Sequence, residues 1–502
     1  MNHPIYLNLV SLIFGVFGMC FVAWLFSEDR RVIPWRVIIW GIGLQLVLGA
    51  AVFLFPLTRV FLDWFNNLLN VVFEAADRGA RFVFGNAIVP DPNNPPDVAL
   101  GYIFAFRALP TVIFFSGLMA LLDNLGLIKP VVNFFGEIFY RTMRLSGAEA
   151  LSGSANIFVG IEAAIVVKPF LAKMTRSELC AILACCFGTA ASSVLAIYVS
   201  FLRPVFPNIL GHLVSASIIA IPACFVLSKI MVPEVDKPLT MGGIPKEADF
   251  KDADQNDDND DKLEAVGGEL MKRTSPLDAA ILGALDGVKM SVSIAAVLIL
   301  ILGLVYLLDA LFAGLAMLPV LGAVFQYVTL DNITGVLFYP LTLMTGVSWD
   351  DSWQAAVIVG SRLFKTAIPA YGALAAAAQA GEISDRTVLI VSYALSGFAH
   401  VASVGIFVGG TIALIPSRRK EISELGWKAM FIGTLACMMI ASIAGFMDTG
   451  NPSILGIPAE EAAAIVEPAP DAPANTSEAA IPPDASNQTE PTNSIGEDTE
   501  PN

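Results

Sequence analysis

The sequence predicts an all-α polytopic membrane protein with about eight transmembrane helices and two re-entrant helical hairpins in an inverted repeat. The first supporting observation is the composition of the 502 residues, of which 56% are hydrophobic and only 15% charged, with a mean hydropathy of +0.69. The second is a series of apolar segments long enough to cross a bilayer. The third is a pair of apolar stretches, one in each half of the chain, that charged and polar side chains interrupt.

Eight apolar segments are predicted to span the membrane, because each approaches the ~20 residues that a helix needs to cross the hydrocarbon core. They lie at about residues 5–26, 37–57, 100–127, 179–202, 209–230, 288–312, 387–414 and 429–446. Two further segments, 60–84 and 131–144, alternate apolar and polar side chains at helical spacing. This pattern predicts amphipathic helices, the first of them lying in the membrane interface.

The stretch from Ser146 to Ser200 is apolar but contains ionisable side chains such as Glu162 and Lys168. Two short apolar pieces, each about half a bilayer crossing, flank a break around Asn156–Gly160. A membrane accommodates broken backbone and ionisable groups only where protein buries them or where they line a wet cavity. A carboxylate at mid-depth costs about 2.5–3.5 kcal/mol on insertion scales. We therefore predict a re-entrant hairpin that contributes to a solute-binding site in a transporter.

A second stretch of this kind covers residues 348–381, where Arg362, Lys365 and Pro369 interrupt the apolar run. It predicts a second re-entrant hairpin. A weak internal similarity supports the repeat, since CFGTAASSV from Cys186 resembles GFAHVASVG from Gly397. Paired discontinuous segments in the two halves of a transporter point to a binding site near the midplane.

Basic residues predict the orientation, because cytoplasmic loops of membrane proteins are enriched in Lys and Arg. They gather after the first and third spans, around residues 168–176 and at 418–420. Both termini are therefore expected outside the cytoplasm. The first hairpin then enters from the cytoplasmic side and the second from the opposite side, which makes the repeat inverted.

The net charge of −16 comes from two hydrophilic segments rather than from the membrane body. Residues 234–273 contain 12 acidic and 6 basic side chains, and residues 448–502 contain 11 acidic and no basic side chains. Both are predicted to be solvated and disordered. The six cysteines fall in apolar segments and form no CxxC pair, so neither a disulfide framework nor a metal site is predicted.

Several segments resemble the concentrative nucleoside transporter family, in order and at the spacing of that family, between about Leu57 and Met447. They are SGAEALSGSANIFVG from Ser146, IEAAIVVKPFLAKMTRSEL from Ile161, FGTAASSVLAIYVS from Phe187, DGVKMSV from Asp286, SYALSGFAHVASVGI from Ser392 and TIALIPSRR from Thr411. The resemblance implies a homotrimer in a bacterial inner membrane, in which a transport part moves elevator-fashion against a scaffold. It also implies cation-coupled uptake of nucleosides, usually with sodium and in some members with protons, and no other cofactor.

The predicted division of the chain follows from this resemblance. A scaffold is expected at residues 1–130 and 277–345, a transport part at 131–232 and 346–447, an acidic cytoplasmic linker at 233–276 and a disordered tail at 448–502. The lipid bilayer and a small nucleoside-like solute are the expected partners, and no nucleic acid is.

The resemblance also implies site residues. The sodium ligands of the family fall on Asn156 and Thr189 and on the backbone carbonyls of Val159 and Ala190. The substrate contacts fall on the following residues: Ile161, Glu162, Val194, Thr366, Phe398, His400 and Ser403.

The chain departs from the family motifs at the substrate contacts. GIEAAI from Gly160 stands for the family's G-Q-T-E-A-P and keeps Glu162, whereas TAIPAY from Thr366 stands for N-E-F-V-A-Y and replaces the ribose-binding Glu by Ala367. Because a site built to bond a hydroxyl discriminates strongly, loss of this carboxylate should remove most ribose selection. A different polar or anionic solute is therefore the second candidate substrate.

Several individual residues admit a second interpretation. Glu162 could pair with Lys168 instead of contacting substrate or cation, and His400 could be a core histidine rather than a ligand or a proton-coupling group. Arg362 and Lys365 could extend to the outer interface or turn inward and favour an anionic solute. For the protein as a whole, a passive pore is the competing class of transport protein, whereas no nucleophile elbow, HExxH motif or metal cluster supports an enzyme.

Overall fold

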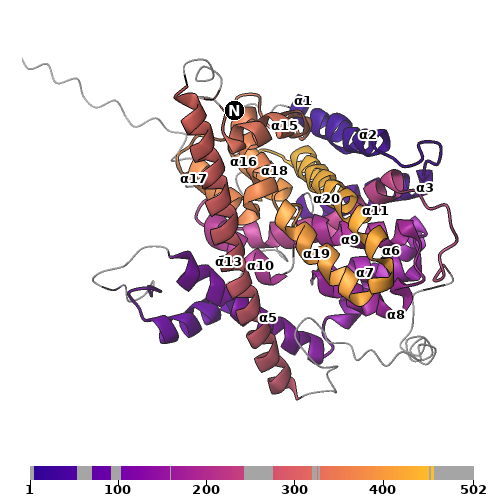
Figure 1. Ribbon diagram of the computed structural model, residues 1–502, viewed down its shortest axis with the longest axis horizontal. Helices are drawn as coiled ribbons and strands as arrows, with labels where there is room; N and C mark the ends of the chain where they lie inside the picture. Colours follow the sequence, from indigo (N-terminus) through magenta and orange to yellow (C-terminus); the bar gives the residue numbers. More distant parts are fainter. Residues whose placement is uncertain are drawn as a thin grey trace, which may run out of the picture. The chain divides into compact units, whose positions relative to one another are not determined.

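The structure is a computed structural model. It describes residues 5–53, 71–91, 103–158, 160–190, 192–241, 275–318, 328–451 and 454–456, with residues 96, 243 and 325. Every element of more than one residue in this part is helical (Figure 1). Most of the acidic linker and of the tail lies outside the described residues. Residues 60–70 of the amphipathic segment 60–84 also lie outside them, and 71–84 is helical.

Six described helical segments are long and apolar enough to cross a membrane. They are Ile5–Leu25, which comprises α1 (Ile5–Val10), η1 (Ser11–Phe17) and α2 (Gly18–Leu25), then α3 (Trp35–Phe53), α5 (Phe104–Asn124), α11 (Ile209–Met231), α13 (Pro276–Ala316) and Pro416–Met447, which comprises η3 (Pro416–Arg418) and α20 (Arg419–Met447). They correspond in order to the predicted spans one, two, three, five, six and eight. The all-helical prediction is thereby confirmed.

The predicted spans four and seven are each broken into two helices. Span four consists of α9 (Arg176–Gly188) and α10 (Ser192–Leu202), and span seven of α18 (Asp385–Ala394) and α19 (Val401–Leu414). We expected continuous helices here. The first break begins where Thr189 leaves the helical region for an extended conformation at φ −117° and ψ 168°. Breaks of this kind leave backbone carbonyls at the helix ends unpaired and available to other groups.

The two predicted hairpins consist of short helical segments, three in the first and two in the second. The first consists of α7 (Gly147–Ala155), η2 (Ile161–Val167) and α8 (Lys168–Leu171). The second consists of α16 (Ser352–Lys365) and α17 (Ala367–Gln379), which packs on α10 and α18. Two further helices flank the hairpins, because α6 (Lys129–Met143) packs on α7 and α15 (Leu330–Met344) packs on α16.

Helices α11 and α20 form the centre of the structure. Of their most apolar stretches, 89% and 83% are buried, against 12% for α13. Around α20 pack α9, α18, α11 and η1, and α3 packs on α11. The N-terminal helices thus contact elements that the sequence assigned to the transport part. The division into scaffold and transport parts describes motion and stays a prediction.

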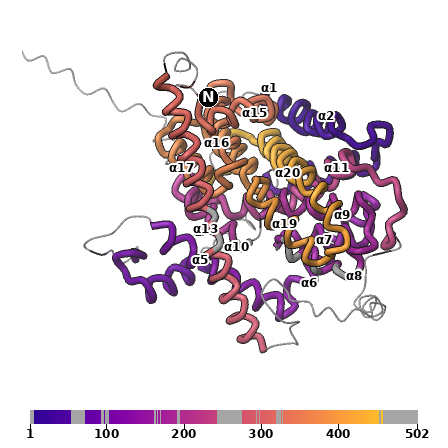
Figure 2. The backbone as a smooth tube through the Cα atoms, in the orientation of Figure 1, coloured from indigo at the N-terminus to yellow at the C-terminus, as the bar shows by residue number. Residues whose placement is uncertain are grey.

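Helix α13 runs along α5 (Figure 2), and small residues let the two backbones approach closely. A Cβ atom at Gly283 would lie 2.4 Å from the Cβ atom of Ala120, and one at Gly117 would lie 2.9 Å from the carbonyl oxygen of Ala280. At 41 residues α13 is about 60 Å long. Of these two helices, only α5 packs substantially against a broken span, through its contact with α10.

A buried ion-pair network closes the base of the first hairpin. Ser146 and Glu149 form a reciprocal capping box at the start of α7. The other carboxylate oxygen of Glu149 lies 2.5 Å from Nζ of Lys229 on α11, and both side chains are almost fully buried. Lys229 also bonds Glu234 at 3.1 Å. The network therefore joins the hairpin to the end of α11.

The base of the second hairpin is closed mainly by neutral donors to one carboxylate. Oδ2 of Asp351, just before α16, accepts hydrogen bonds from the backbone N–H of Ser384 at 3.0 Å and from the hydroxyls of Ser384 and Thr387, both at 2.6 Å. Ser384 is also the N-cap of α18. This carboxylate thus joins the second hairpin to the start of span seven.

Candidate functional site

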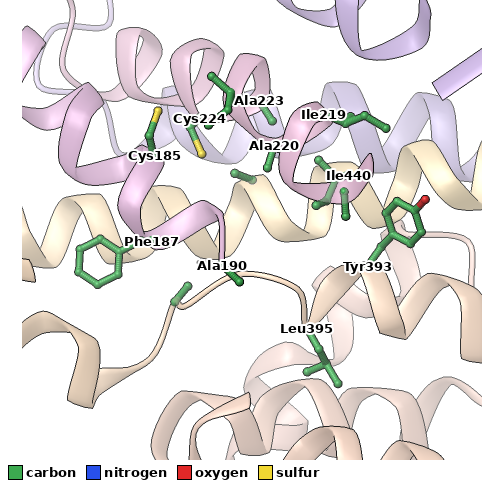
Figure 3. Close-up of a cluster of buried hydrophobic side chains, with 14 of the residues drawn as sticks. Cys185, Phe187, Ala190, Ile219, Ala220, Ala223, Cys224, Tyr393, Leu395 and Ile440 are labelled. Carbon is green, nitrogen blue, oxygen red and sulfur yellow. The ribbon is translucent and has the colours of Figure 1, made fainter. Parts of the chain in front are cut away.

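The two breaks lie against each other and against α20. A Cβ atom at Gly397 would lie 2.8 Å from the carbonyl oxygen of Gly188 and 2.5 Å from Sγ of Cys437. A Cβ atom at Gly433 would lie 2.5 Å from that of Phe187. Glycine at these positions is therefore what permits the close approach. Figure 3 shows Ala190 in the non-helical stretch that follows Phe187. The predicted cation and substrate segments thus share one region of the core.

Asn156 follows α7 at the tip of the first hairpin and is completely buried. Its Nδ2 donates to the carbonyl of Ser152 at 3.1 Å, whereas Oδ1 has no hydrogen-bond partner among the described residues. A buried polar oxygen without a partner is costly, so such atoms usually mark a site for water, an ion or a ligand. The tip also approaches α9, because Sγ of Cys186 lies 4.0 Å from the carbonyl oxygen of Gly160.

Thr189 and Ala190 lie in the first break and are buried. The Thr189 hydroxyl donates to the carbonyl of Cys185 at 2.8 Å, which leaves lone pairs on its oxygen as acceptors. The fourth predicted ligand, Val159, lies outside the described residues. The oxygen atoms of Asn156 and Thr189 are the kind of donors that a hard cation prefers, so the described residues fit a sodium ion.

Three of the predicted substrate residues lie in or just after the second break. The imidazole of His400 caps α19, because its Nδ1 accepts from the backbone N–H of Ser403 at 3.3 Å. The Ser403 hydroxyl lies 2.9 Å from Nε2 of the same ring. The Phe398 ring is 5.9 Å from the imidazole, centroid to centroid. His400 and Ser403 are thus bonded to each other, which gives the histidine a structural partner, and their role toward a substrate stays a prediction.

The remaining predicted substrate residues come from other elements. Val194 is buried on α10. Ile161 and Glu162 begin η2, which packs against α19, but their side chains lie outside the described residues. The backbone of the first hairpin therefore approaches the half-span that follows Phe398.

Thr366 forms the tip of the second hairpin with φ +71° and ψ 173°. This region is almost restricted to glycine, so a β-branched residue there is strained. Its side chain is buried, and Oγ1 has no hydrogen-bond partner among the described residues. Such strain persists only where the surroundings enforce it, and it concentrates at functional sites.

The two basic residues of α16 point in different directions. Arg362 is completely buried and donates from Nη1 to the carbonyl of Ala394 at 2.5 Å, which excludes an extension to the interface. Lys365 is part-exposed and pairs with Asp331 at 2.6 Å. Helical periodicity does not explain this difference, because both residues follow buried residues by seven, Arg362 after Ala355 and Lys365 after Ile358.

Family models match three consecutive parts of the chain. The N-terminal model of Na⁺-dependent nucleoside transporters matches residues 14–87, a model described as nucleoside recognition matches 105–205, and the C-terminal model of the same transporters matches 212–445. An uncharacterized transporter of Haemophilus influenzae is 32% identical over 448 residues, which cover 88% of this chain and 98% of that protein. The chain belongs to the concentrative nucleoside transporter family. It is therefore a multi-pass membrane protein of a family of transporters.

Further relatives of this transporter agree. The human protein named solute carrier family 28 member 3 is 32% identical over 451 residues, but these cover only 59% of its length. A solved structure described as CNTnw in an inward-facing substrate-bound state superposes with a TM-score of 0.77 at 31% identity, covering 90% of this chain and 100% of that one. The fold is thus the all-helical, elevator-type fold of the family.

Proposed function

We propose that this transporter is a secondary active importer that couples the entry of sodium to the entry of nucleosides or a related nucleobase-bearing solute. Membership of the family supports the class of solute. The observation that carries the proposal is the completely buried Oδ1 atom of Asn156, which lacks a hydrogen-bond partner among the described residues. Such an atom suits a bound cation better than an apolar core, and the oxygen of Thr189 at the end of α9 is a donor of the same kind.

Coupling follows from the contact between the two breaks. A cation that bonds Asn156 and Thr189 holds the first hairpin tip against the end of α9. That end lies against Gly397, one residue before Phe398, where the solute would bind. Cation and solute therefore favour the same arrangement, which is the requirement for coupled binding.

The proposed scaffold is α5 with α13, and the remaining described spans form the transport part. Contacts of α3 with α11 and of η1 with α20 support assigning the N-terminal helices to the moving part, unlike the division expected from the sequence. The exposed apolar surface of α13 suits lipid or another protomer. A homotrimer in a bacterial inner membrane, with both termini outside the cytoplasm, completes the proposal.

The test is uptake of labelled uridine and adenosine by purified protein in proteoliposomes, with and without an inward sodium gradient. We expect accumulation above equilibrium only with the gradient, and reduced sodium affinity in Asn156→Ala. Glu162→Ala should lose uptake, whereas Asn124→Ala, an exposed amide at the end of α5, should behave as the unmodified protein. Accumulation driven equally well by a proton gradient alone would exclude sodium as the required ion. Absence of uptake in folded protein would exclude both nucleosides.

A further inference from the structure

The second break contains a positive charge of its own. Arg362 is in the last turn of α16, near the tip of the second hairpin, and its side chain is completely buried. Nη1 donates to the carbonyl oxygen of Ala394, the last residue of α18, at 2.5 Å. In the described part of the chain, Nε and Nη2 bond no oxygen or nitrogen atom, although the thiol of Cys437 lies within hydrogen-bonding reach of the guanidinium, and no carboxylate forms an ion pair with it.

The carbonyl that Arg362 bonds is at the C-terminal end of helix α18, where a positive charge is stabilising. The last carbonyls of a helix have no partner within the helix and carry the negative end of its dipole, which a cation stabilises. In span seven this end of α18 is buried, so water does not solvate it. Because Arg362 has no carboxylate partner among the described residues, its charge is directed at this carbonyl instead.

The same arrangement occurs in the first repeat with one difference. There the residue after the first hairpin helix, Asn156, offers an oxygen atom, and the end of α9 offers Thr189. Both groups are acceptors, so a cation must come from solution. In the second repeat the hairpin itself supplies the cation, and Ala394 supplies the acceptor.

We infer that Arg362 is the resident cation of the second break and does there what the mobile sodium ion does in the first. It fixes the end of α18 against the second hairpin, so that this break has no vacancy for an ion. The transport core then binds one sodium ion per chain. The comparison with sodium and the number of ions rest on the proposed function, whereas the effect of the charge on the end of α18 does not. Arg362 acts here as a positioning residue, through the carbonyl of Ala394.

The groups around Arg362 agree with this assignment. The guanidinium interacts electrostatically with Tyr198 and Tyr371, whose rings stack at 4.3 Å, with the imidazole of His400 and with the thiol of Cys437. Tyr198 is on α10, Tyr371 on α17 and Cys437 on α20. None of these groups carries a full negative charge near neutral pH. Among the described residues, no carboxylate therefore neutralises the charge of Arg362, which lies where the second hairpin and both broken spans converge.

The test compares Arg362→Lys with Arg362→Gln, and uses Lys365→Gln as the control because Lys365 is on the same helix but part-exposed. Thermal unfolding of the purified protein is followed as sodium chloride replaces choline chloride at constant ionic strength. We expect the unmodified protein, Arg362→Lys and Lys365→Gln to show the sodium dependence of one bound ion. Arg362→Gln should unfold at a lower temperature in choline and show a steeper dependence, because the neutral break now admits a second ion.

Uptake gives the second readout. We expect Arg362→Gln to lose about tenfold or more in uridine uptake at low sodium, and Arg362→Lys to retain most of it, because a charge that organises the site is missing only in the former. If Arg362→Lys and Arg362→Gln lower the unfolding temperature and uptake equally, the charge of Arg362 does not fix the end of α18. The same conclusion follows if Arg362→Gln changes neither quantity. If the unfolding temperature of the unmodified protein shows the sodium dependence of two bound ions, the claim that the second break binds no ion is wrong.

These outcomes are separable from the fate of the proposed function. If sodium does not stabilise the unmodified protein relative to choline, the proposed coupling to sodium is wrong. The difference in unfolding temperature between Arg362→Lys and Arg362→Gln still decides the role of Arg362. Should Arg362→Gln fail to fold, a folded Arg362→Lys with unchanged sodium dependence supports the inference, and an unfolded Arg362→Lys overturns it.

Discussion

The bases of the two hairpins do the same structural work with different chemistry. At the first base a lysine, Lys229, bridges two carboxylates in a nearly dry environment. At the second base one carboxylate, Asp351, is satisfied by hydroxyl and amide donors of the following span. A buried ion pair is costly to break on one side because the other charge remains, whereas neutral donors lose less. Substitutions at the two hairpin bases should therefore differ in how much they lower the free energy of unfolding.

The largest effect is expected at the first base. Glu149→Ala leaves Lys229 buried with Glu234 as its remaining ion-pair partner, and we expect a loss of about 3 kcal/mol in the free energy of unfolding. Denaturation of the purified protein in detergent measures this loss. The double substitution Glu149→Met with Lys229→Met should be less destabilised than Glu149→Ala, since no unpaired charge remains. Equal losses in the single and the double variant would mean that packing rather than charge stabilises the base of the first hairpin.

A smaller effect is expected at the second base. Asp351→Ala removes the acceptor of three donors from Ser384 and Thr387, which should cost about 1–3 kcal/mol of unfolding free energy. The neighbouring Asp350→Ala is the matched control, because Asp350 is exposed. A loss at Asp351 larger than that at Glu149 would reverse the comparison between the two bases.

Acid should weaken the ion pairs of Glu28, which lies near the base of the first hairpin. Glu28 bonds Arg176 at the start of α9 at 2.9 Å and also contacts Lys428 on α20. Burial opposes the charge of Glu28, but these two cations hold its pKa below the ordinary value of 4.5. A depressed pKa stabilises the folded state fully above pH 4.5 and loses this effect as the pH falls through the lower value. Unfolding temperatures of the unmodified protein and Glu28→Gln should therefore converge below pH 4.5.

The smallest effect is expected for the part-exposed neighbour of Arg362 on α16. The ion pair of Lys365 with Asp331 is partly solvated, so Lys365→Gln should change the free energy of unfolding by less than about 1 kcal/mol. Chemical denaturation measures this value. A loss comparable to that of Asp351→Ala would mean that the second hairpin depends on charge at its tip as much as the first does at its base.

The sequence predicted the spans and hairpins better than the details within them. Apolar length located α3, α11 and α20, and charged interruptions located both hairpins. The breaks at Thr189 and after Ala394 were not predicted, because hydropathy averages over a few non-helical residues. The glycines at these breaks, Gly188 and Gly397, pack closely against residues distant in the sequence, which hydropathy does not register.

For the site, residue type and resemblance identified candidates but not their partners. Oδ1 of Asn156 has no hydrogen-bond partner among the described residues, and its role as a cation ligand stays a prediction. The bond between His400 and Ser403 was not foreseen. The charged interruption of the apolar run identified Arg362, but neither its burial nor the carbonyl that it contacts was predicted. Periodicity gives the face of a helix on which a residue lies, but which group meets it there is a property of the tertiary structure.

The conformation of Thr366 also limits how this transporter can change during evolution and engineering. At φ +71° and ψ 173° glycine is the residue that enters without strain, so the threonine persists at the expense of about 1–3 kcal/mol of stability. A single substitution of Thr366 by glycine should therefore relieve the backbone strain at the hairpin tip and raise the free energy of unfolding. For structural studies it is a rational first position for a stabilised variant, and for natural variants it is a position where gain in stability and loss of a hydroxyl group arrive together.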